Sequence, residues 1–273
     1  MERSVLSVAA LPMYDVAEIR WANDALWAFV SARLRTQDIP GVPDQLDRSD
    51  DLMAIWQHPG LLLAQTCGYP LVTRLTGHVR VVATPRYAVP GCSGAWHRSF
   101  ILVRCEDPAA TLSDLRGRIC ALNSWDSNSG MNLLRAAVAP RADGAPFFGS
   151  IIETGSHLAS LAAVASGTAD IAAIDCVTYA HARRWYADLT ARTRILDQTP
   201  VSPGLPLITA GTATDDRIAR LRRALFDAAS EPALASARAQ LFLDGFESLD
   251  PAVFDRVLML ERAAAQSGYP QLC

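Results

Sequence analysis

The residues best suited to chemistry are the small polar ones at a single turn, Ser127, Asn128, Ser129 and Gly130. The apolar run 119–122 before the turn predicts a strand, and residues 131–138 after it predict a helix. Hydroxyl residues and a glycine at a strand-to-helix turn leave several backbone N–H groups uncrowded. The helix dipole adds partial positive charge at the same place, so the turn is suited to holding an anion.

Other polar residues stand beside predicted strands, where a ligand-binding edge of an α/β sheet forms. They are Tyr14, which follows a strand predicted over residues 4–11, and then Tyr69, Ser99, Ser156, His157 and Asp175. Each also has an explanation without a ligand, because serine and aspartate cap helices and tyrosines fill interfaces. Their shared position at strand ends favours a common pocket.

These residues must be positioned by a fold large enough for two lobes. The chain has 273 residues, of which 50% are hydrophobic and 19% charged. Strand-like and helix-like patterns alternate, which predicts an α/β fold with mostly parallel sheets, and the patterns after the last strand, near 207–210, indicate helices only. Pro/Gly-rich breaks near 88–94 and 200–206 mark two crossings between lobes.

The two crossings predict that one lobe is inserted into the other. We expect a discontinuous first lobe of residues 1–90 and 205–273, and an inserted second lobe of residues 91–204. Two such lobes would form a cleft between them, and the polar residues at the strand ends would line it.

Composition disfavours several classes of protein. A net charge of −3 without an arginine-rich patch argues against a nucleic-acid partner. No apolar stretch approaches the roughly 20 residues that span a bilayer. The six cysteines lack metal-ligand spacing, so we expect buried free thiols, no metal and no cofactor. The N-terminal segment does not read as a signal peptide, which predicts either a cytoplasmic protein or a chain that begins after a removed leader.

The order of motifs along the chain resembles the phosphonate-binding-protein-like family. The resemblance covers about residues 14–206 and rests on Cys-Gly-Tyr-Pro at 67–70, the serine-rich turn, Gly-Ser-His at 155–157 and the strand at 169–175. It implies a type II periplasmic-binding-protein fold with two lobes. It also implies a solute-binding protein that captures a small anionic or zwitterionic ligand, such as a phosphonate or phosphate, by hinge closure for uptake by an ABC permease. The location would be periplasmic after removal of a leader.

The same resemblance implies roles for individual residues. The serine-rich turn would bind the anion, and His157 would contact the ligand and could add a proton and charge near neutral pH. Asp175 would meet an ammonium group on the ligand. Tyr14, Tyr69 and Ser99 would match further ligand contacts of the family.

Two other functions stay open on the sequence alone. Cytoplasmic enzymes of the menaquinone pathway, which act on chorismate-derived carboxylates, share the fold and lack a leader. The second alternative is a sensory module whose ligand-bound form is recognised by a partner protein. A hydrolytic triad of Ser127, His157 and Asp175 is disfavoured, because no GxSxG elbow surrounds the serine. Asp126 lies beside the turn and its carboxylate would repel a dianion, so the sequence does not determine the charge of the ligand.

Overall fold

The computed structural model describes residues 7–273, and the chain divides into two compact units. The first unit comprises Met1–Ala88 and Gly204–Pro251, and the second comprises Val89–Pro203 and Ala252–Cys273. Sequence patterns placed all residues after 205 in the first lobe. The structure corrects this for residues 252–273, which belong to the second unit.

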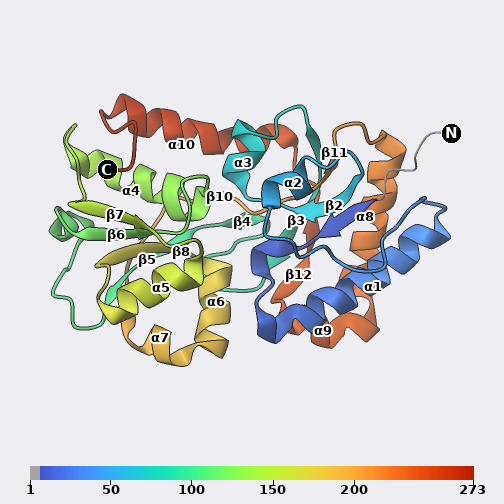
Figure 1. Cartoon of the computed structure of the whole chain (residues 1–273), viewed down its shortest axis with the longest axis horizontal. Helices are drawn as coiled ribbons and strands as arrows, with labels where there is room; N and C mark the ends of the chain where they lie inside the picture. Colours follow the sequence, from blue (N-terminus) through green and yellow to red (C-terminus); the bar gives the residue numbers. More distant parts are fainter. Residues whose placement is uncertain (1–6) are drawn as a thin grey trace. The chain divides into compact units, whose positions relative to one another are not determined.

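The first unit is built on a five-stranded sheet of order β1-β2-β11-β3-β12 (Figure 1). Its strands are β1 (Val8–Ala10), β2 (Leu61–Gln65), β11 (Leu207–Ala210), β3 (Val79–Tyr87) and β12 (Leu243–Glu247). Its helices are α1 (Arg20–Thr36), α2 (Leu52–Trp56), α3 (Gly68–Thr73), α8 (Asp215–Ser230) and α9 (Ala235–Gln240). Short 3₁₀ turns occupy Pro12–Tyr14, Ala17–Ile19 and Pro232–Leu234. Of the strand predicted over 4–11, positions 4–6 lie outside the described residues.

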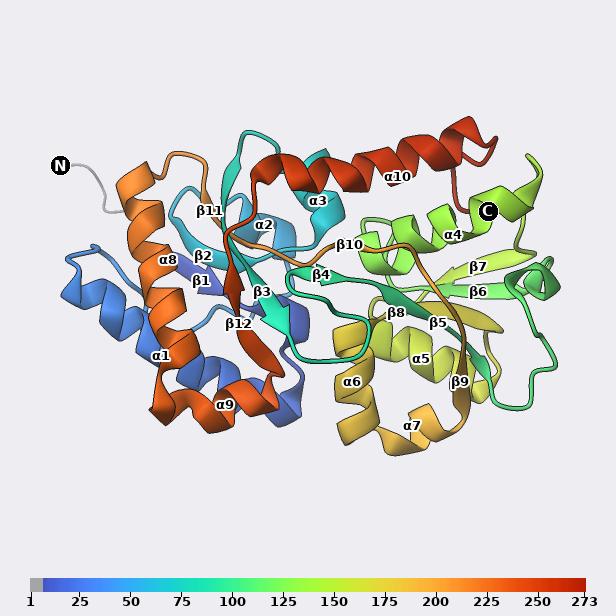
Figure 2. The same cartoon turned by 180° about the vertical axis from the view of Figure 1, so that it is seen from behind.

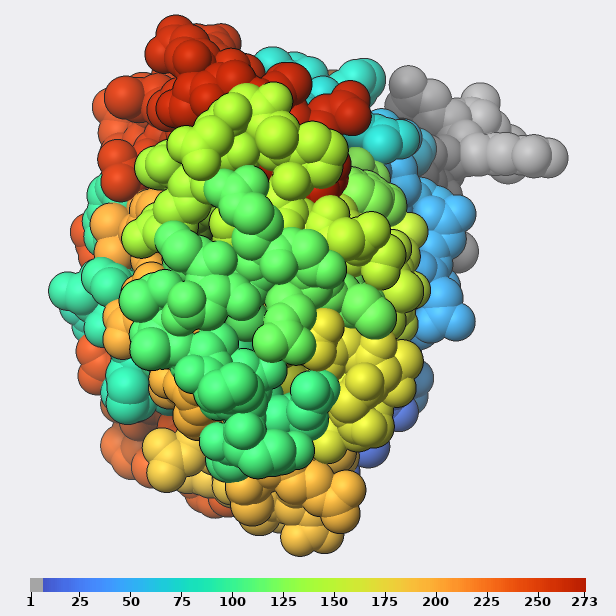
Figure 3. Space-filling model, turned by 90° about the vertical axis from the view of Figure 1, so that its left-hand side faces the viewer, coloured from blue at the N-terminus to red at the C-terminus, as the bar shows by residue number. Residues whose placement is uncertain are grey.

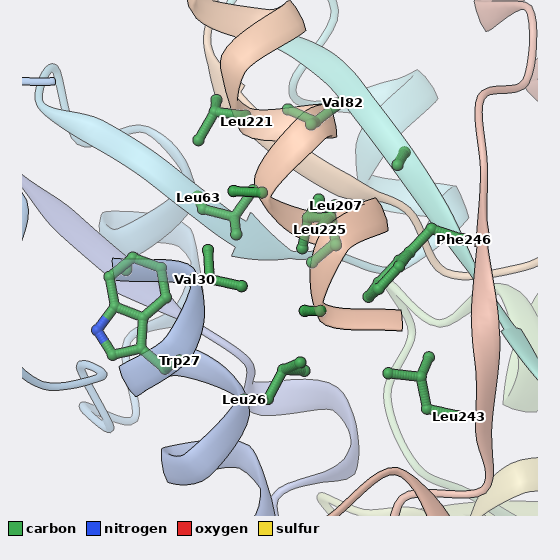
Figure 4. Packing of buried hydrophobic residues seen from close by; sticks show 14 of the residues in the cluster. Leu26, Trp27, Val30, Leu63, Val82, Leu207, Leu221, Leu225, Leu243 and Phe246 are labelled. Carbon is green, nitrogen blue, oxygen red and sulfur yellow. The ribbon is translucent and has the colours of Figure 1, made fainter. Parts of the chain in front are cut away.

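The core of the first unit lies between its sheet and the helices α1, α8 and α9. Trp27 of α1 and Leu225 of α8 are at most 2% exposed and belong to one buried cluster with Leu63 and Leu207 of the sheet (Figure 4). Burying a side chain of this size stabilises a fold by about 1.5–3 kcal/mol. The apolar stripes of these helices therefore face the sheet, as their periodicity predicts.

The second unit carries a sheet of order β7-β6-β8-β5-β9 and a two-stranded ribbon of β10 with β4. The strands are β4 (Trp96–His97), β5 (Ser99–Arg104), β6 (Ile119–Leu122), β7 (Ser150–Glu153), β8 (Ile171–Asp175), β9 (Thr193–Gln198) and β10 (Ser202–Pro203). The helices are α4 (Leu133–Ala142), α5 (His157–Ser166), α6 (Cys176–Trp185), α7 (Ala187–Ala191) and α10 (Asp255–Gln266). Shorter turns are Leu112–Leu115, Asn128–Asn132 and Pro251–Phe254. In both cartoons α4 and α10 lie on one side of this sheet and α5, α6 and α7 on the other (Figure 1, Figure 2).

Both five-stranded sheets are mixed, so the prediction of mostly parallel sheets is wrong. β6 runs parallel to β7 and β8, and β1 runs parallel to β2. β5 is antiparallel to β8 and β9, and β11 and β12 pair antiparallel with their neighbours. A β-α-β pattern predicts direction only for strands joined through a helix. The antiparallel pairs join strands far apart in the sequence, and β12 lies between two predicted helices, where no strand was predicted.

The C-terminal helix α10 is held to the second unit by buried polar contacts. Asn132 Nδ2 donates a hydrogen bond of 3.1 Å to the carbonyl of Val257. Arg135 lies 3.3 Å from a carboxylate oxygen of Glu261 and donates to the carbonyl of Pro270 at 2.9 Å. Figure 3 shows the red C-terminal segment against the yellow-green surface of α4. Over residues 7–273, no helix is both long and apolar enough to cross a membrane.

Candidate anion-binding site

Three parallel strands of the second unit end at the same edge of the sheet and lead into helical turns. β6 leads into the turn Asn128–Asn132, β7 into α5 and β8 into α6. The residues that cap these three starts are Ser127, Ser156 and Asp175. Because a helix start presents unpaired N–H groups and partial positive charge, this edge favours an anion.

The predicted turn is a π-helical turn that runs directly into α4. Ser127 has an extended backbone, and its Oγ accepts a hydrogen bond of 2.9 Å from the N–H of Gly130. Ser127, Asn128 and Ser129 are at most 5% exposed. The hydroxyl of Ser127 therefore acts as a helix cap, as the simpler explanation of this residue predicted.

Gly130 lets two side chains approach the turn. A Cβ atom added to Gly130 would lie 1.8 Å from Asn123 Oδ1 and 3.2 Å from His157 Cε1. No other residue fits at this position without displacing Asn123. Asn123 Oδ1 is buried and has no hydrogen-bond partner in the described part of the chain.

Three of the predicted residues form one hydrogen-bonded group. Ser129 Oγ lies 2.8 Å from His157 Nε2, and Ser99 Oγ donates to the carbonyl of Ser129 at 2.9 Å. Ser99 opens β5, His157 opens α5, and Ser129 lies between them on the π-helical turn. The structure thus brings together residues that are 30 and 28 positions apart in the sequence.

The pKa of His157 lies below its ordinary value of 6.5, because burial disfavours the charged ring and the nearby charge of His97 adds to this effect. Asp175 and the carbonyl of Ala173 act in the opposite direction without reversing the shift. The surroundings of the ring therefore favour its neutral form. The expectation that His157 adds a proton and charge near neutral pH stays a prediction.

Asp175 is engaged by the protein through both carboxylate oxygens. Oδ1 accepts from the N–H groups of Val177 and Thr178, at 2.9 and 3.1 Å, and so caps α6. Oδ2 accepts from Nδ1 of the buried His97 at 2.8 Å. Burial opposes both charges, but the hydrogen bond and mutual attraction raise the pKa of His97 and lower the pKa of Asp175. The two side chains form a buried ion pair, and the predicted contact of Asp175 with a ligand ammonium group stays a prediction.

This pairing leaves no Ser-His-Asp triad among the three residues considered. Asp175 hydrogen-bonds to His97, and Ser127 caps the turn. A hydrolytic triad needs the carboxylate on the histidine that faces the serine. The Ser129 and His157 pair lacks that carboxylate, so the arrangement is better suited to holding an oxyanion than to activating a nucleophile.

The remaining predicted residues are described within their own units. Ser156 is exposed, and its Oγ caps α5 through the N–H of Ala159 at 3.1 Å. Tyr14 and Tyr69 belong to the first unit: Tyr14 is buried with its ring edge-on to Tyr87 at 5.1 Å, and Tyr69 is half-buried in α3. Asp126 is exposed beside the turn.

The sequence analysis singled out Asn128 but not the residues that support it and the turn, which are Ser202, Asn132 and Arg135. Asn128 Nδ2 donates to Ser202 Oγ at 2.9 Å and its Oδ1 accepts from Asn132 at 3.1 Å. Arg135, only 4% exposed, donates to Asn132 Oδ1 at 2.7 Å. The only local signal was the i, i+4 spacing of the two asparagines, which places them on one side of a helix. These contacts fix the turn on which Ser129 is carried.

Comparisons with known proteins agree with this fold. A binding protein component of an ABC phosphonate transporter from Pseudomonas aeruginosa is 15% identical, with a TM-score of 0.77 over 97% of this chain and 88% of the other. A Prochlorococcus marinus protein solved with methylphosphonate is 15% identical, with a TM-score of 0.73 over 96% and 98%. A Xanthomonas citri protein solved with ATP is 20% identical, with a TM-score of 0.72 over 97% and 98%. These similarities confirm the predicted periplasmic-binding-protein fold.

A comparison with curated proteins gave no match. Residues 56–254 match the family model for the periplasmic substrate-binding proteins of ABC phosphonate transporters. This match includes the π-helical turn, His157 and Asp175, and it favours a binding protein over an enzyme. The chain belongs to the phosphonate ABC-transporter family of periplasmic substrate-binding proteins.

Proposed function

We propose that this chain binds a small ligand through a phosphonate or phosphate group held at the turn 127–130 of the second unit. The observation that carries the proposal is the contact of 2.8 Å between Ser129 Oγ and His157 Nε2 at a helix start. When the Nε2–H of the neutral ring donates to Ser129 Oγ, the hydroxyl can donate its own proton to an oxyanion, beside the N–H groups of the first turn. Ser99 holds the carbonyl of Ser129 and so positions this pair.

The class of ligand follows from the donors. A tetrahedral oxyanion presents three or more acceptor oxygens, which suits a set of hydroxyl, imidazole and backbone N–H donors. Two proteins of the same fold were solved with methylphosphonate and with ATP, both of which carry phosphorus oxyanions. These two compounds are therefore the first probes for the present chain.

The family also suggests a cellular role. We infer delivery of the ligand to an ABC permease, and a periplasmic location for the mature protein. A permease and an ATPase encoded beside the gene would support this role, whereas quinone-biosynthesis genes would favour the enzymatic alternative.

The proposal is tested by calorimetric titration of the full chain with methylphosphonate, inorganic phosphate, ATP, methanesulfonate and acetate. We expect binding of at least one phosphorus oxyanion and no turnover of it. Ser129→Ala and His157→Ala should each weaken that binding by about 1–3 kcal/mol, the range for hydrogen bonds to charged groups. Unchanged affinity in both variants would remove the proposed site, and turnover lost in His157→Ala would replace the binding function by an enzymatic one.

Matched controls come from residues of the same types outside the site. Ser166 is exposed near the end of α5, and His78 is exposed in the first unit. Ser166→Ala and His78→Ala should leave the affinity unchanged. Tyr69→Ala tests the predicted contribution of Tyr69, a residue of the first unit, to ligand binding. The variant should fold, because this side chain is only half-buried.

A further inference from the structure

Two cysteines of the second unit face each other outside the hydrogen-bonded group of Ser99, Ser129 and His157. Cys92 Sγ lies 3.4 Å from Cys176 Sγ, although the residues are 84 positions apart in the sequence. Cys176 is fully buried as the first residue of α6, and Cys92 is half-buried in the segment by which the chain enters the second unit. All six cysteines are free thiols in this structure.

The backbone around these cysteines is also in close contact. Gly91 has a φ of +94°, and a Cβ atom added to it would lie 2.7 Å from Cys176 Cβ. The N–H of Cys92 donates to the carbonyl of Val89 at 3.1 Å, which closes a turn over α6. A disulfide joins sulfurs at about 2.05 Å, so the two Sγ atoms need to approach by only about 1.3 Å.

We propose that Cys92 and Cys176 are a site of covalent cross-linking, at which a disulfide ties the entry segment 89–94 to the start of α6. The family match to periplasmic proteins supports this, because that compartment favours disulfides. The proposal does not depend on which anion the protein binds.

The reaction is a thiol–disulfide exchange with a small or protein disulfide as the oxidant. The more accessible Cys92 loses its proton, and its thiolate attacks the oxidant, which releases one thiol and leaves a mixed disulfide on Cys92. Cys176 then loses its proton, and its thiolate displaces the second thiol. The two cysteines give up two electrons and two protons, and the oxidant disulfide becomes two thiols.

This order of steps follows from the surroundings of the two thiols. The contact with Cys92 and burial both raise the pKa of Cys176, so its thiolate is disfavoured until Cys92 has reacted. Once Cys92 carries the mixed disulfide, the sulfur that Cys176 must attack is already next to it.

A metal ion is the competing use of these residues. Donor atoms of His97, Asp175 and Cys176 lie within 4.8 Å of one another. Each oxygen of Asp175, however, already accepts a hydrogen bond from the protein, from Val177 and Thr178 or from His97. The pair of adjacent sulfurs is therefore the feature that the protein leaves available for new chemistry.

The test compares the full chain after treatment with oxidised glutathione and after reduction, each followed by unfolding and alkylation of free thiols. We expect Cys92 and Cys176 to escape alkylation in the oxidised sample, and a linked peptide pair that contains both of them. The cross-link should also raise Tm by roughly 5–10 °C, since it closes a long loop of the unfolded chain.

Cys92→Ser should abolish both effects, and Cys105→Ser, at an exposed cysteine, should change neither. Cys92 is the better position to replace, because it is only half-buried and the variant should fold. Six alkylated thiols after oxidation would overturn the proposal, as would a linkage between other cysteines. Zinc bound at one equivalent by the reduced chain and lost in Cys176→Ser would replace the proposal with a metal site.

Discussion

Two histidines in the second unit differ in charge because they differ in partner. His97 is 3% exposed and donates to the carboxylate of Asp175 at 2.8 Å. His157 has a buried Nδ1, and its Nε2 meets the hydroxyl of Ser129 at the same distance of 2.8 Å. Burial lowers the pKa of both rings. Asp175 hydrogen-bonds only to His97 and reverses the shift there, whereas its charge acts on His157 without reversing the shift.

The comparison separates a structural histidine from a candidate binding one. In a buried ion pair such as His97 with Asp175, the two charges compensate each other within the protein. A neutral pair of hydroxyl and imidazole, with the ring donating to the hydroxyl, keeps one O–H donor that an anion can use, and its ring can gain charge when the anion arrives. The Ser129 and His157 pair is therefore the better place for an oxyanion, although the two pairs have the same hydrogen-bond length.

The largest expected difference between the two pairs is in stability. Asp175→Ala leaves the charge of His97 buried without a partner and removes the cap of α6, so the free energy of unfolding should fall by about 3–5 kcal/mol. Ser129→Ala removes one neutral hydrogen bond and should cost about 1 kcal/mol. Urea unfolding at neutral pH measures both. Equal losses of unfolding free energy in the two variants would show that the charges of His97 and Asp175 do not contribute to stability.

Asp175→Asn separates the two contributions at this position. Asparagine caps a helix almost as well as aspartate, so the variant keeps the cap and loses the charge. A stability close to that of the unaltered protein would assign the effect to capping alone.

The second prediction concerns the packing of the uncharged pair. Gly130→Ala places a methyl group 1.8 Å from Asn123 Oδ1 and should lower the free energy of unfolding by about 1–3 kcal/mol. Asn123→Ala in the same chain opens the space and should restore most of the loss. A double-mutant cycle by urea unfolding measures this coupling, and additive losses would contradict the contact.

The pair of His97 and Asp175 could not be predicted from the sequence, whereas the turn 127–130 could. The anion turn was predicted correctly as a helix start, because strand, cap and glycine are local signals. The partnership of His97 with Asp175 joins residues 78 positions apart, through the antiparallel register that sets Ser99 opposite Asp175. A sheet assumed to be mostly parallel hides that register.

The overall fold could be predicted from the sequence, but the unit to which α10 belongs could not. Alternating patterns and motif order gave the fold and its family. The position of α10 depends on the ion pair of Arg135 with Glu261 and on the hydrogen bond from Asn132 to Val257. No local sequence pattern predicts these contacts. An amphipathic helix shows which face it buries but not which unit receives it.

The third prediction uses the opposite pKa shifts. The pKa of His97 is raised above 6.5, so its contribution to stability is complete below pH 6.5 and is lost as pH rises through the folded-state pKa. The pKa of His157 is lowered, so its contribution is complete above pH 6.5 and is lost as pH falls through the folded-state pKa. Ring titrations by NMR, assigned with His97→Gln and His157→Gln, should give one pKa on each side of 6.5. If both pKa values lay on the same side of 6.5, the two histidines would not differ in charge as their partners predict.

The smallest effect is expected when the anion binds. A phosphonate beside the neutral ring of His157 should raise the pKa of that ring, so the complex takes up protons that the free protein does not hold. His97 is already charged and should contribute no uptake. Calorimetry in buffers of different ionisation enthalpy measures the protons gained, and His157→Gln subtracts those that belong to the ligand. We expect fractional uptake near pH 6.5 that is lost in the variant, with an affinity up to about tenfold higher at the acidic side for one unit of pKa shift. Uptake that persists in His157→Gln would place the responding group elsewhere and remove His157 from contact with the anion.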